Sequence, residues 1–458
     1  MGRMVFQRPT SFLSSAQFWL TASVLALAPL FFGSVDRLSI ALWTLLLSLS
    51  VLCGLNKPLA RRQVQILVAF FILCGAYACV ALLQIVPNFI GWRLNDPIWQ
   101  RTADLLRLQV APRISSRAEI PPVVIGHLLV FVTAFVSGFL TGTSRRNADR
   151  LLAAARYSIL VYAAYGLLAL ALTPDMLLWA PRTAYQGSVT ATFVNHNTAA
   201  TYIGAGVILW FCSASVRLPS LHRTSFRYIL LAPSSETLAL KALLHAAAGL
   251  TCFFALLLTG SRGGLICSCV GLLVALSLLF INRVKPDLRY TLVALPLGLV
   301  LTGIWLSRAG RIGSAGAFDD ARWLVYRLCA QAVLDRPWLG TGAGSFADIF
   351  PSLRTDELKS WGVWEYAHST ILEIALEMGI PIAVTVILGA VASVTILIWF
   401  ALKSTDRGQI LPFAISGILV LSYLHSLIDF SLQVPGYFIV FAILIGCALS
   451  RASADPER

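Results

Sequence analysis

Charged residues are scarce in this sequence, and their scarcity excludes most classes of soluble protein. Only 12% of the 458 residues are Asp, Glu, Lys or Arg, whereas 58% are hydrophobic. The mean hydropathy is +0.79. Soluble globular domains have about 25% charged residues. The composition therefore predicts a membrane protein that crosses the bilayer many times. The usual estimate of domain number from chain length, which holds for soluble proteins, does not apply to it.

The sequence also lacks the patterns that bind metals or nucleic acids. Its nine Cys include no Cys-x-x-Cys pair, so neither a disulfide framework nor a zinc site is predicted. The formal net charge is +14, but the basic residues are scattered singly and in small clusters, so no nucleic-acid partner is expected. No Asp-x-Asp sequence or carboxylate cluster occurs in the segments expected to face outward, which favours chemistry without a metal or other cofactor.

Long apolar runs dominate what is present. A membrane span needs about 20 mostly apolar residues, and this rule predicts an all-α polytopic bundle of about twelve transmembrane helices. Residues 1–458 would form one integral membrane domain in contact with membrane lipids, and the first helix is expected to be retained rather than cleaved as a signal peptide. The predicted spans lie near residues 17–34, 38–55, 65–86, 122–143, 154–173, 196–216, 241–259, 262–281, 290–307, 379–400, 411–428 and 434–451.

The distribution of Lys and Arg between the short loops predicts the orientation of the chain. When the gaps between spans are numbered from the N-terminus, nearly all Lys and Arg residues of the short loops fall on one side. The positive-inside rule then places both termini in the cytoplasm and two long segments, 87–121 and 308–378, on the outer side. No ATP is available there, so a transfer reaction needs a donor that is already activated.

Segment 308–378, between the ninth and tenth predicted spans, is the longest polar stretch, and long loops of this kind usually carry function. Arg322 follows an acidic pair at the start of an amphipathic helix predicted over 321–334. A functional arginine and a charged surface helix, with Arg327 on its solvent face, are equal alternatives there. Residues 340–346 contain three glycines, but no Lys follows them and no strand precedes them. A tight turn is therefore predicted there instead of a phosphate-binding loop. The other polar residues noted in this segment are Arg308, Arg311, Asp319 and Asp320.

Arg262 and His368 are the strongest candidates for chemistry. Arg262 stands between glycines at the outer end of a predicted hairpin of two spans, where its planar guanidinium suits a diphosphate. The alternative is an arginine that reaches to lipid headgroups. His368 begins a helical pattern that runs into the tenth predicted span, where it is placed to act as a general base. A structural polar residue at a helix start is the alternative, and Glu365, Tyr366 and Glu373 are the candidate orienting partners.

Two further groups are weaker candidates for substrate contact. Asn195, His196 and Asn197 open the sixth predicted span, where they can contact sugar hydroxyls or simply cap the helix. His425 and Asp429 are four residues apart, so a continuous helix would place them on one face. A buried structural hydrogen bond is an equal alternative for that pair.

Taken together in chain order, these motifs resemble the O-antigen ligase and polymerase family of bacterial envelope glycosyltransferases. The resemblance covers about the C-terminal 60% of the chain, residues 188–448 being the ligase-like core region, while the first four spans match only in hydropathy. One departure is that 379–382 lacks the second glycine usual after the histidine motif. The motifs are Phe193-Val194-Asn195-His196-Asn197, Thr259-Gly260-Ser261-Arg262-Gly263, residues 320–344, residues 368–381 and His425-Ser426-Leu427-Ile428-Asp429-Phe430.

The resemblance implies an inner-membrane glycosyltransferase with a periplasmic active site. It implies transfer of a glycan, without metal and with inversion, from undecaprenyl diphosphate to a sugar hydroxyl of lipid A core or of a lipid-linked saccharide, in O-antigen or exopolysaccharide biosynthesis. The family's two arginines and histidine map to Arg262, Arg322 and His368. Arg327 is an additional candidate for substrate contact.

Other functions remain open at this point. About twelve spans is also a common plan for a transporter of a lipid or small solute, although no Asp or Glu falls in the middle of a predicted span, as coupled transport usually requires. An enzyme that O-glycosylates proteins from the same donor is a third possibility. The sequence does not separate ligase from polymerase. Segment 87–121, with Trp92, Arg93, Trp99, Arg101 and Arg107, is either an acceptor-binding surface or a segment resting on the membrane interface.

Overall fold

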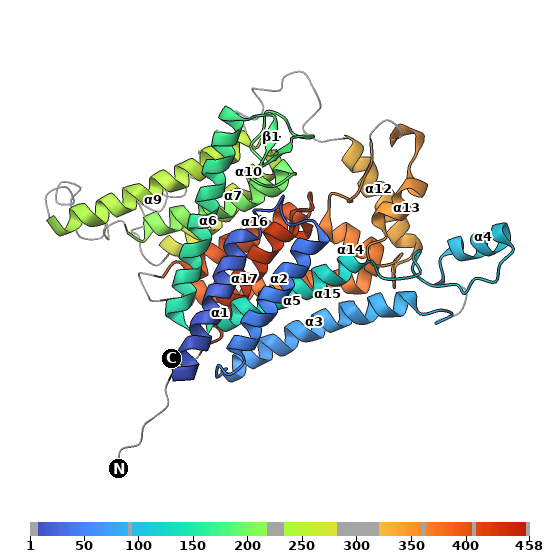
Figure 1. The fold of residues 1–458 in the computed structure, drawn as a ribbon, viewed down its shortest axis with the longest axis horizontal. Helices are drawn as coiled ribbons and strands as arrows, with labels where there is room; N and C mark the ends of the chain where they lie inside the picture. Colours follow the sequence, from blue (N-terminus) through green and yellow to red (C-terminus); the bar gives the residue numbers. More distant parts are fainter. Residues whose placement is uncertain are drawn as a thin grey trace, which may run out of the picture.

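The computed structural model describes residues 8–89, 94–217, 233–281, 320–358, 362–404 and 409–454. Over these ranges the chain is almost entirely α-helical, as predicted, with one short β-hairpin (Figure 1). The predicted span 290–307, the residues Arg308, Arg311 and Asp319, and Trp92 with Arg93 lie outside the described residues. The elements are α1 (Arg8–Leu27), α2 (Arg37–Gly54), α3 (Arg61–Ile85), α4 (Pro97–Leu106), α5 (Pro122–Gly142), α6 (Arg145–Leu172), β1 (Met176–Leu177), β2 (Ala180–Pro181), α7 (His196–Ser215), α9 (Pro233–Leu258), α10 (Arg262–Phe280), α12 (Asp320–Asp335), α13 (Phe346–Leu353), η2 (Asp356–Leu358), α14 (Thr370–Met378), α15 (Ile380–Lys403), α16 (Leu411–Ser426), η3 (Ser431–Gln433) and α17 (Pro435–Ala452).

Within the described residues, nine helices are long and apolar enough to cross a membrane, and Phe12–Leu27 and Leu411–Ser426 are shorter apolar helices. The protein is therefore a membrane protein with many spans, and a total of about twelve stays a prediction. Every predicted span inside the described residues coincides with a helix, but the first boundary is wrong. Helix α1 ends at Leu27 because Pro29 disfavours helical backbone at Ala28, and the chain then turns through Phe32, Gly33 and Ser34, all with positive φ.

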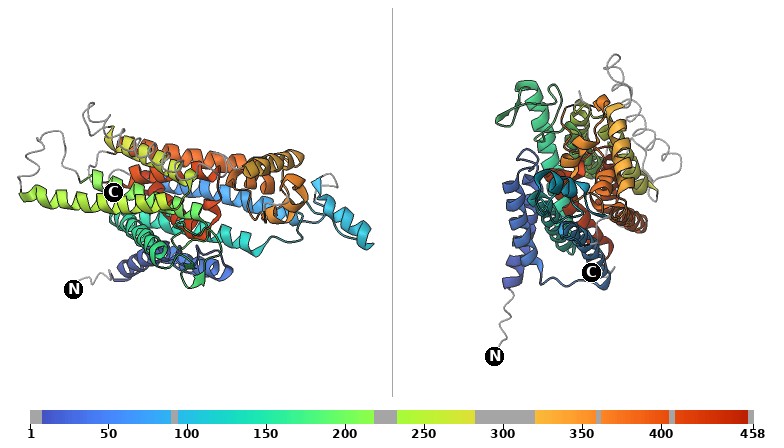
Figure 2. Two further views of the ribbon diagram at one scale, coloured as in Figure 1. Left: turned by 90° about the horizontal axis from the view of Figure 1, so that it is seen from above. Right: turned by 90° about the vertical axis from the view of Figure 1, so that its right-hand side faces the viewer.

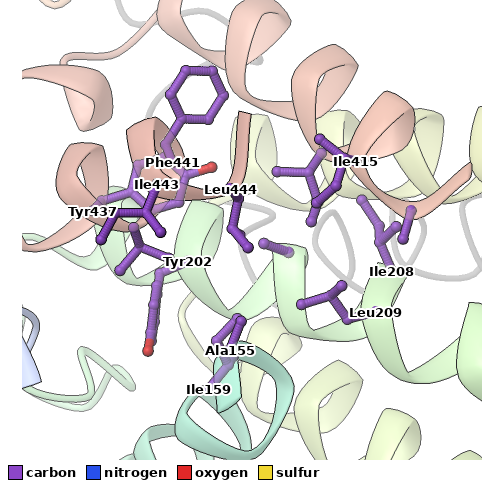
Figure 3. Close-up of a cluster of buried hydrophobic side chains, with 14 of the residues drawn as sticks. Ala155, Ile159, Tyr202, Ile208, Leu209, Ile415, Tyr437, Phe441, Ile443 and Leu444 are labelled. Atoms are coloured by element: carbon purple, nitrogen blue, oxygen red, sulfur yellow. The ribbon is translucent and has the colours of Figure 1, made fainter. Parts of the chain in front are cut away.

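Helices α7 and α17 form the centre of the bundle. The apolar windows of both are 89% buried, against 22% for the peripheral α15. Side chains of α6, α7, α16 and α17 meet in the core shown in Figure 3, where Tyr202 of α7 and Tyr437 of α17 are fully enclosed. Burial on every side explains why these two helices carry no polar face.

Glycines allow α5 and α17 to pack backbone against backbone. A Cβ atom at Gly138 would lie 2.1 Å from the carbonyl oxygen of Ile443, and one at Gly142 would lie 2.3 Å from that of Cys447. Gly446 makes the reciprocal approach to Phe135. Small residues bring helices this close in membranes, where dispersion contacts replace the hydrophobic effect between helices.

The two long polar segments lie together at one end of the bundle. Figures 1 and 2 show α4, α12 and α13 at the end of the bundle that lies away from both termini. Arg336 pairs with Asp96 at 2.7 Å, Arg117 pairs with Asp348, and the Ser116 amide donates to the carbonyl of Thr341 at 3.1 Å. The described parts of the two segments therefore contact each other, and their placement on the outer side stays a prediction.

The helix predicted to run from His368 into the tenth span is interrupted. Helix α14 ends at Met378 and α15 begins at Ile380, because Gly379 has a φ of 85° and breaks the helical path. A Cβ atom there would lie 2.3 Å from the carbonyl oxygen of Trp338, so glycine also permits close contact with the segment after α12. The break leaves α14 among the polar segments, outside the candidate spans.

Candidate functional site

The turn after α16 is the centre of the candidate site. Helix α16 ends at Ser426, so the expectation that His425 and Asp429 share one helix face is wrong. Asp429 instead lies in the turn before η3, where Asn197 Nδ2 donates to its Oδ1 at 3.0 Å and the Ser431 hydroxyl donates to its Oδ2. The structure thus holds a buried carboxylate between the start of α7 and the end of α16.

His425 has a structural hydrogen bond, the alternative considered for it. Its Nδ1 is 2.6 Å from Thr201 Oγ1, and that hydroxyl lies 3.0 Å from Ser431 Oγ. A Cβ atom at Gly263 would lie 3.3 Å from His425 Nε2. The small residue therefore lets the first turn of α10, with Arg262, lie directly against α16.

His368 lies in the loop before α14, with its backbone fixed from two sides. Its φ is +54°, a left-handed conformation that favours Asn, Asp and His among side chains other than glycine. The Tyr326 hydroxyl donates to its carbonyl oxygen at 2.8 Å, and the amide of Ala367 donates to Glu373 Oε2 at 2.7 Å. The imidazole is held edge to face by Trp364, at 5.3 Å between centroids, and Phe430, at 5.0 Å.

The acidic neighbour of His368 is Asp429 and not Glu365 or Glu373, the two acids expected to orient it. His368 Nδ1 is 3.9 Å from Asp429 Oδ1, and the side chains are 19% and 1% exposed respectively. Glu373 holds the backbone of Ala367, and Tyr366 stacks on Phe430 with centroids 4.3 Å apart. The hydroxyl of Thr370 also donates to the backbone carbonyl of Asp429 at 3.2 Å, which ties the start of α14 to this turn.

The two arginines approach the same region from different helices. Arg322 of α12 places Nη1 3.5 Å from the carbonyl oxygen of Ile428, the residue before Asp429. Arg262 is the first residue of α10, whose N-terminus is capped by Ser261 through the amide of Gly264 at 3.1 Å. Helix N-termini attract anions, so this position adds to the charge of the guanidinium. Among the described residues, Arg262 has no hydrogen bond or ion pair.

Arg327 lies away from this arrangement. It is exposed, as in the alternative of a charged surface helix, and it follows Arg322 by five positions on the same helix. That spacing places the two side chains about 140° apart around the helix axis. The structure therefore brings Arg262, Arg322 and His368 toward one turn, but not Arg327.

The polar start of α7 forms one wall of the site. Asn195 is a helix cap, with Oδ1 accepting from the amide of Asn197 at 2.6 Å, whereas the side chain of Asn197 binds Asp429. His196 Nδ1 is 2.7 Å from the carbonyl oxygen of Thr259, and its ring stacks on Tyr185 with centroids 4.2 Å apart. Burial, and then the charge of Asp429, raise the pKa of Tyr185. Asn195 thus has the capping role considered for it, while Asn197 orients a carboxylate.

The glycine-rich segment forms a tight turn, as predicted, and it binds a carboxylate of this chain. Gly340, Gly342 and Gly344 have φ values of 64°, 117° and 71°. The amides of Gly344 and Phe346 donate to the two carboxylate oxygens of Glu377, each at 2.9 Å. Burial raises the pKa values of both Glu377 and Glu373, one helical turn earlier on α14.

Several of these contacts could have been found in the sequence. Tyr326 is four residues after Arg322, so one face of a helix carries both a cation and the hydroxyl that fixes His368. Asp429 is an acid directly after an apolar run. A charged side chain in a membrane costs free energy, so an acid at such a position often indicates a functional residue. The pairing of Asp429 with Asn197 joins residues 232 positions apart, and no local pattern reports such a contact.

A comparison with known protein families finds a match in the second half of the chain. Residues 247–387 match the O-antigen ligase family. The chain contains an O-antigen ligase domain. The domain runs from α9 into α15 and includes Arg262, Arg322 and His368, while Asn197, His425 and Asp429 lie outside it. A search of curated proteins finds no match to the chain.

The match and the candidate spans together describe a membrane protein with an O-antigen ligase domain. Within the described ranges, no group of three or more His, Cys, Asp or Glu side chains could hold a metal ion.

Proposed function

We propose that this protein transfers a glycan from undecaprenyl diphosphate to a sugar hydroxyl at the outer face of the bacterial inner membrane. One observation carries the proposal. His368 Nδ1 lies 3.9 Å from the buried carboxylate of Asp429, and Arg322 reaches the carbonyl next to that carboxylate. A base, an orienting acid and a cation therefore converge within a domain of the O-antigen ligase family.

In the proposed step, His368 accepts the proton of the acceptor hydroxyl as the oxygen attacks the anomeric carbon. The bond between that carbon and the diphosphate oxygen breaks, and undecaprenyl diphosphate leaves with the electron pair. Attack from the face opposite the diphosphate inverts the anomeric configuration. Asp429 stabilises the imidazolium that forms, because its carboxylate faces Nδ1.

Arg262 and Arg322 bind the diphosphate in this proposal. Negative charge grows on the leaving group as the bond breaks, and guanidinium groups offset that charge with paired hydrogen bonds. Arg262 also stands at the N-terminus of α10, where the helix dipole favours an anion. These groups supply the stabilisation that a metal ion gives in other diphosphate chemistry, so we propose a metal-independent reaction.

The orientation is part of the proposal. The site lies at the end of the bundle that holds α4, α12 and α13, away from both termini (Figure 1). Cytoplasmic termini, which the basic short loops favour, would put this end in the periplasm. The acceptor would be lipid A core for a ligase and another lipid-linked saccharide for a polymerase.

Deletion of the gene followed by complementation tests the proposal. The variants are Arg262→Ala, Arg322→Ala and His368→Asn, because Asn tolerates the left-handed backbone at 368. Loss of long glycan from lipid A core, with polymer left on undecaprenyl diphosphate, would indicate a ligase. Core with a single repeat, or loss of a free exopolysaccharide, would indicate a polymerase.

Two outcomes would contradict the proposal. An unchanged glycan profile in the deletion strain would favour the two alternatives, a transporter or an enzyme that glycosylates proteins. Full complementation by His368→Asn, at wild-type abundance in the membrane, would remove the general base from the mechanism. We expect the wild-type gene to restore the glycan profile of the deletion strain and His368→Asn to leave it unrestored.

A further inference from the structure

A cavity beside the candidate site contains a buried arginine with no acidic partner. The cavity has a volume of about 190 Å³ and lies between the β1–β2 hairpin, the α1–α2 turn and the segment before α7. Arg182, which lines it, is only 7% exposed. Among the residues that the structure describes, no carboxylate lies within ion-pair distance of this guanidinium. Burial of a charge without a counter-charge is costly, so the cavity favours an anion.

The hydrogen bonds around the cavity leave two donors available. Arg182 Nη1 donates to the carbonyl oxygen of Ser188 at 2.7 Å, but its buried Nε has no partner. The Thr190 hydroxyl, on another wall of the same cavity, is 1% exposed and has no partner either. Buried polar atoms are nearly always paired, so two such donors beside one cavity indicate a missing acceptor. Phosphate oxygens accept from both donor types, and the volume is several times the roughly 30 Å³ of one water.

The surroundings indicate that this anion is carried by a lipid. The cavity lies between the end of α6 at Leu172 and the start of α7 at His196, both candidate spans. Phe32, Leu177 and Val194 supply apolar walls. Trp179, at the tip of the hairpin, is 64% exposed and packs its ring on Phe32 with centroids 5.1 Å apart. Exposed Trp side chains are typical of the membrane interface, where lipid phosphates lie.

The cavity is joined to the candidate catalytic residues through a short stretch of chain. Tyr185, whose carbonyl lies 3.5 Å from Arg182 Nη1, stacks on His196, and His196 contacts Thr259 at the turn before Arg262. The amide of Val189 donates to the carbonyl of Leu258 at the end of α9, at 2.9 Å. A lipid anchored in the cavity would therefore lie beside the donor site.

We infer that the cavity binds a phosphate group of the lipid-anchored acceptor through Arg182 and Thr190. This inference rests on the proposed function, which assigns the donor diphosphate to Arg262 and Arg322 and leaves the acceptor without a binding site. The same chemistry would also suit the headgroup of a bulk anionic phospholipid. The experiment has to separate these two sources.

Binding is measured on the purified full-length protein by native mass spectrometry with defined lipids. The probes are lipid A, dephosphorylated lipid A, undecaprenyl phosphate and phosphatidylglycerol. The variants are Arg182→Gln, Arg182→Lys and Thr190→Val, with Arg146→Ala as a control that removes one exposed positive charge from α6. Thermal denaturation verifies that each variant is folded.

We expect Arg182→Gln to weaken binding of lipid A or undecaprenyl phosphate about tenfold, because one charge-assisted hydrogen-bonding group is lost. Arg182→Lys and Thr190→Val should cause smaller losses, and Arg146→Ala none. Dephosphorylated lipid A should bind weakly to every variant. Equal binding of lipid A and undecaprenyl phosphate to the wild type and to Arg182→Gln would overturn the inference. Phosphatidylglycerol that binds as tightly as these two lipids, and with the same dependence on Arg182, would overturn it as well.

A parallel transfer assay keeps this inference separate from the proposed function. His368→Asn should bind the acceptor lipid normally and transfer no glycan, whereas Arg182→Gln should transfer with a raised KM for acceptor and an unchanged KM for donor. Transfer by His368→Asn at the wild-type rate would refute the proposed function whatever the binding data show. An unchanged acceptor KM in Arg182→Gln, with inactive His368→Asn, would refute only the acceptor site.

Discussion

His368 Nδ1 faces Asp429 Oδ1 across 3.9 Å, and the aspartate is fixed in that position by two other groups. Asn197 donates to Oδ1 at 3.0 Å, and Ser431 donates to Oδ2. This separation is longer than a hydrogen bond, but catalytic contacts often shorten only when substrate is bound. With Nδ1 toward the carboxylate, Nε2 is the nitrogen that can take a proton from an acceptor hydroxyl.

Asp429→Asn is the direct test of this relationship. The amide keeps an oxygen for Asn197 and can accommodate the Ser431 hydroxyl, so the fold should persist. We expect the rate of glycan transfer to fall about 10²–10⁴-fold, because the charge that stabilises the imidazolium is removed. The measurement is kcat for transfer from a polyprenyl-diphosphate donor, together with the denaturation midpoint. A variant that keeps more than half of the wild-type kcat would show that Asp429 has only a structural role.

Arg322→Lys separates charge from geometry at the proposed diphosphate site. Lysine keeps the positive charge but loses the planar pair of donors, so the KM for the donor should rise about tenfold. Arg322→Ala should be much less active still, and Arg146→Ala, on α6, should behave like wild type. Equal donor KM values for the wild type and Arg322→Lys would argue against bidentate contact with the diphosphate.

The general architecture followed from the sequence because spans depend on local composition. A run of about 20 apolar residues has few alternatives in a membrane, and the helices from α2 to α17 that were predicted as spans lie close to their expected positions. The turn at 340–346 was also predictable, since its glycines and the missing Lys excluded a phosphate-binding loop. These features depend on residues close together in the chain.

The features that depend on contacts between distant parts of the chain were harder to predict from the sequence. The end of α16 at Ser426 and the break at Gly379 occur inside apolar or helical patterns, so periodicity carried the predicted helices past them. Asp429 was expected to lie beside His425, but its partners come from α7, from η3 and from the loop before α14. A carboxylate of this kind is identified as a partner of His368 only when the tertiary structure brings the two together.

Glu377→Gln should destabilise the protein although it removes a buried charge. Both carboxylate oxygens accept backbone amides, from Gly344 and Phe346 at 2.9 Å each. The NH2 group of Gln cannot accept, so one amide would lose its partner, which costs about 1–3 kcal/mol. The measurement is the denaturation midpoint of the purified variant. Glu357→Gln is the matched control, because Glu357 is exposed, and an equal midpoint for the two variants would contradict the prediction.

Glu373→Gln should change how stability depends on pH. Burial raises the pKa of Glu373 above its ordinary value of 4.5, and the neighbouring Glu377 raises it further. An acid whose pKa is raised by folding contributes stability that is complete below the ordinary pKa and is lost as pH rises through the folded pKa. The wild type should therefore lose stability as the pH rises from about 5 toward alkaline values, and the neutral Gln variant should lose less. Gln keeps an oxygen for the amide of Ala367, which Glu373 binds at 2.7 Å, so the loop that carries His368 should keep its conformation.

The test is the denaturation midpoint of the wild type and of Glu373→Gln, measured across this pH range. Parallel plots of midpoint against pH for the two proteins would show that Glu373 does not titrate in the folded state as its burial requires.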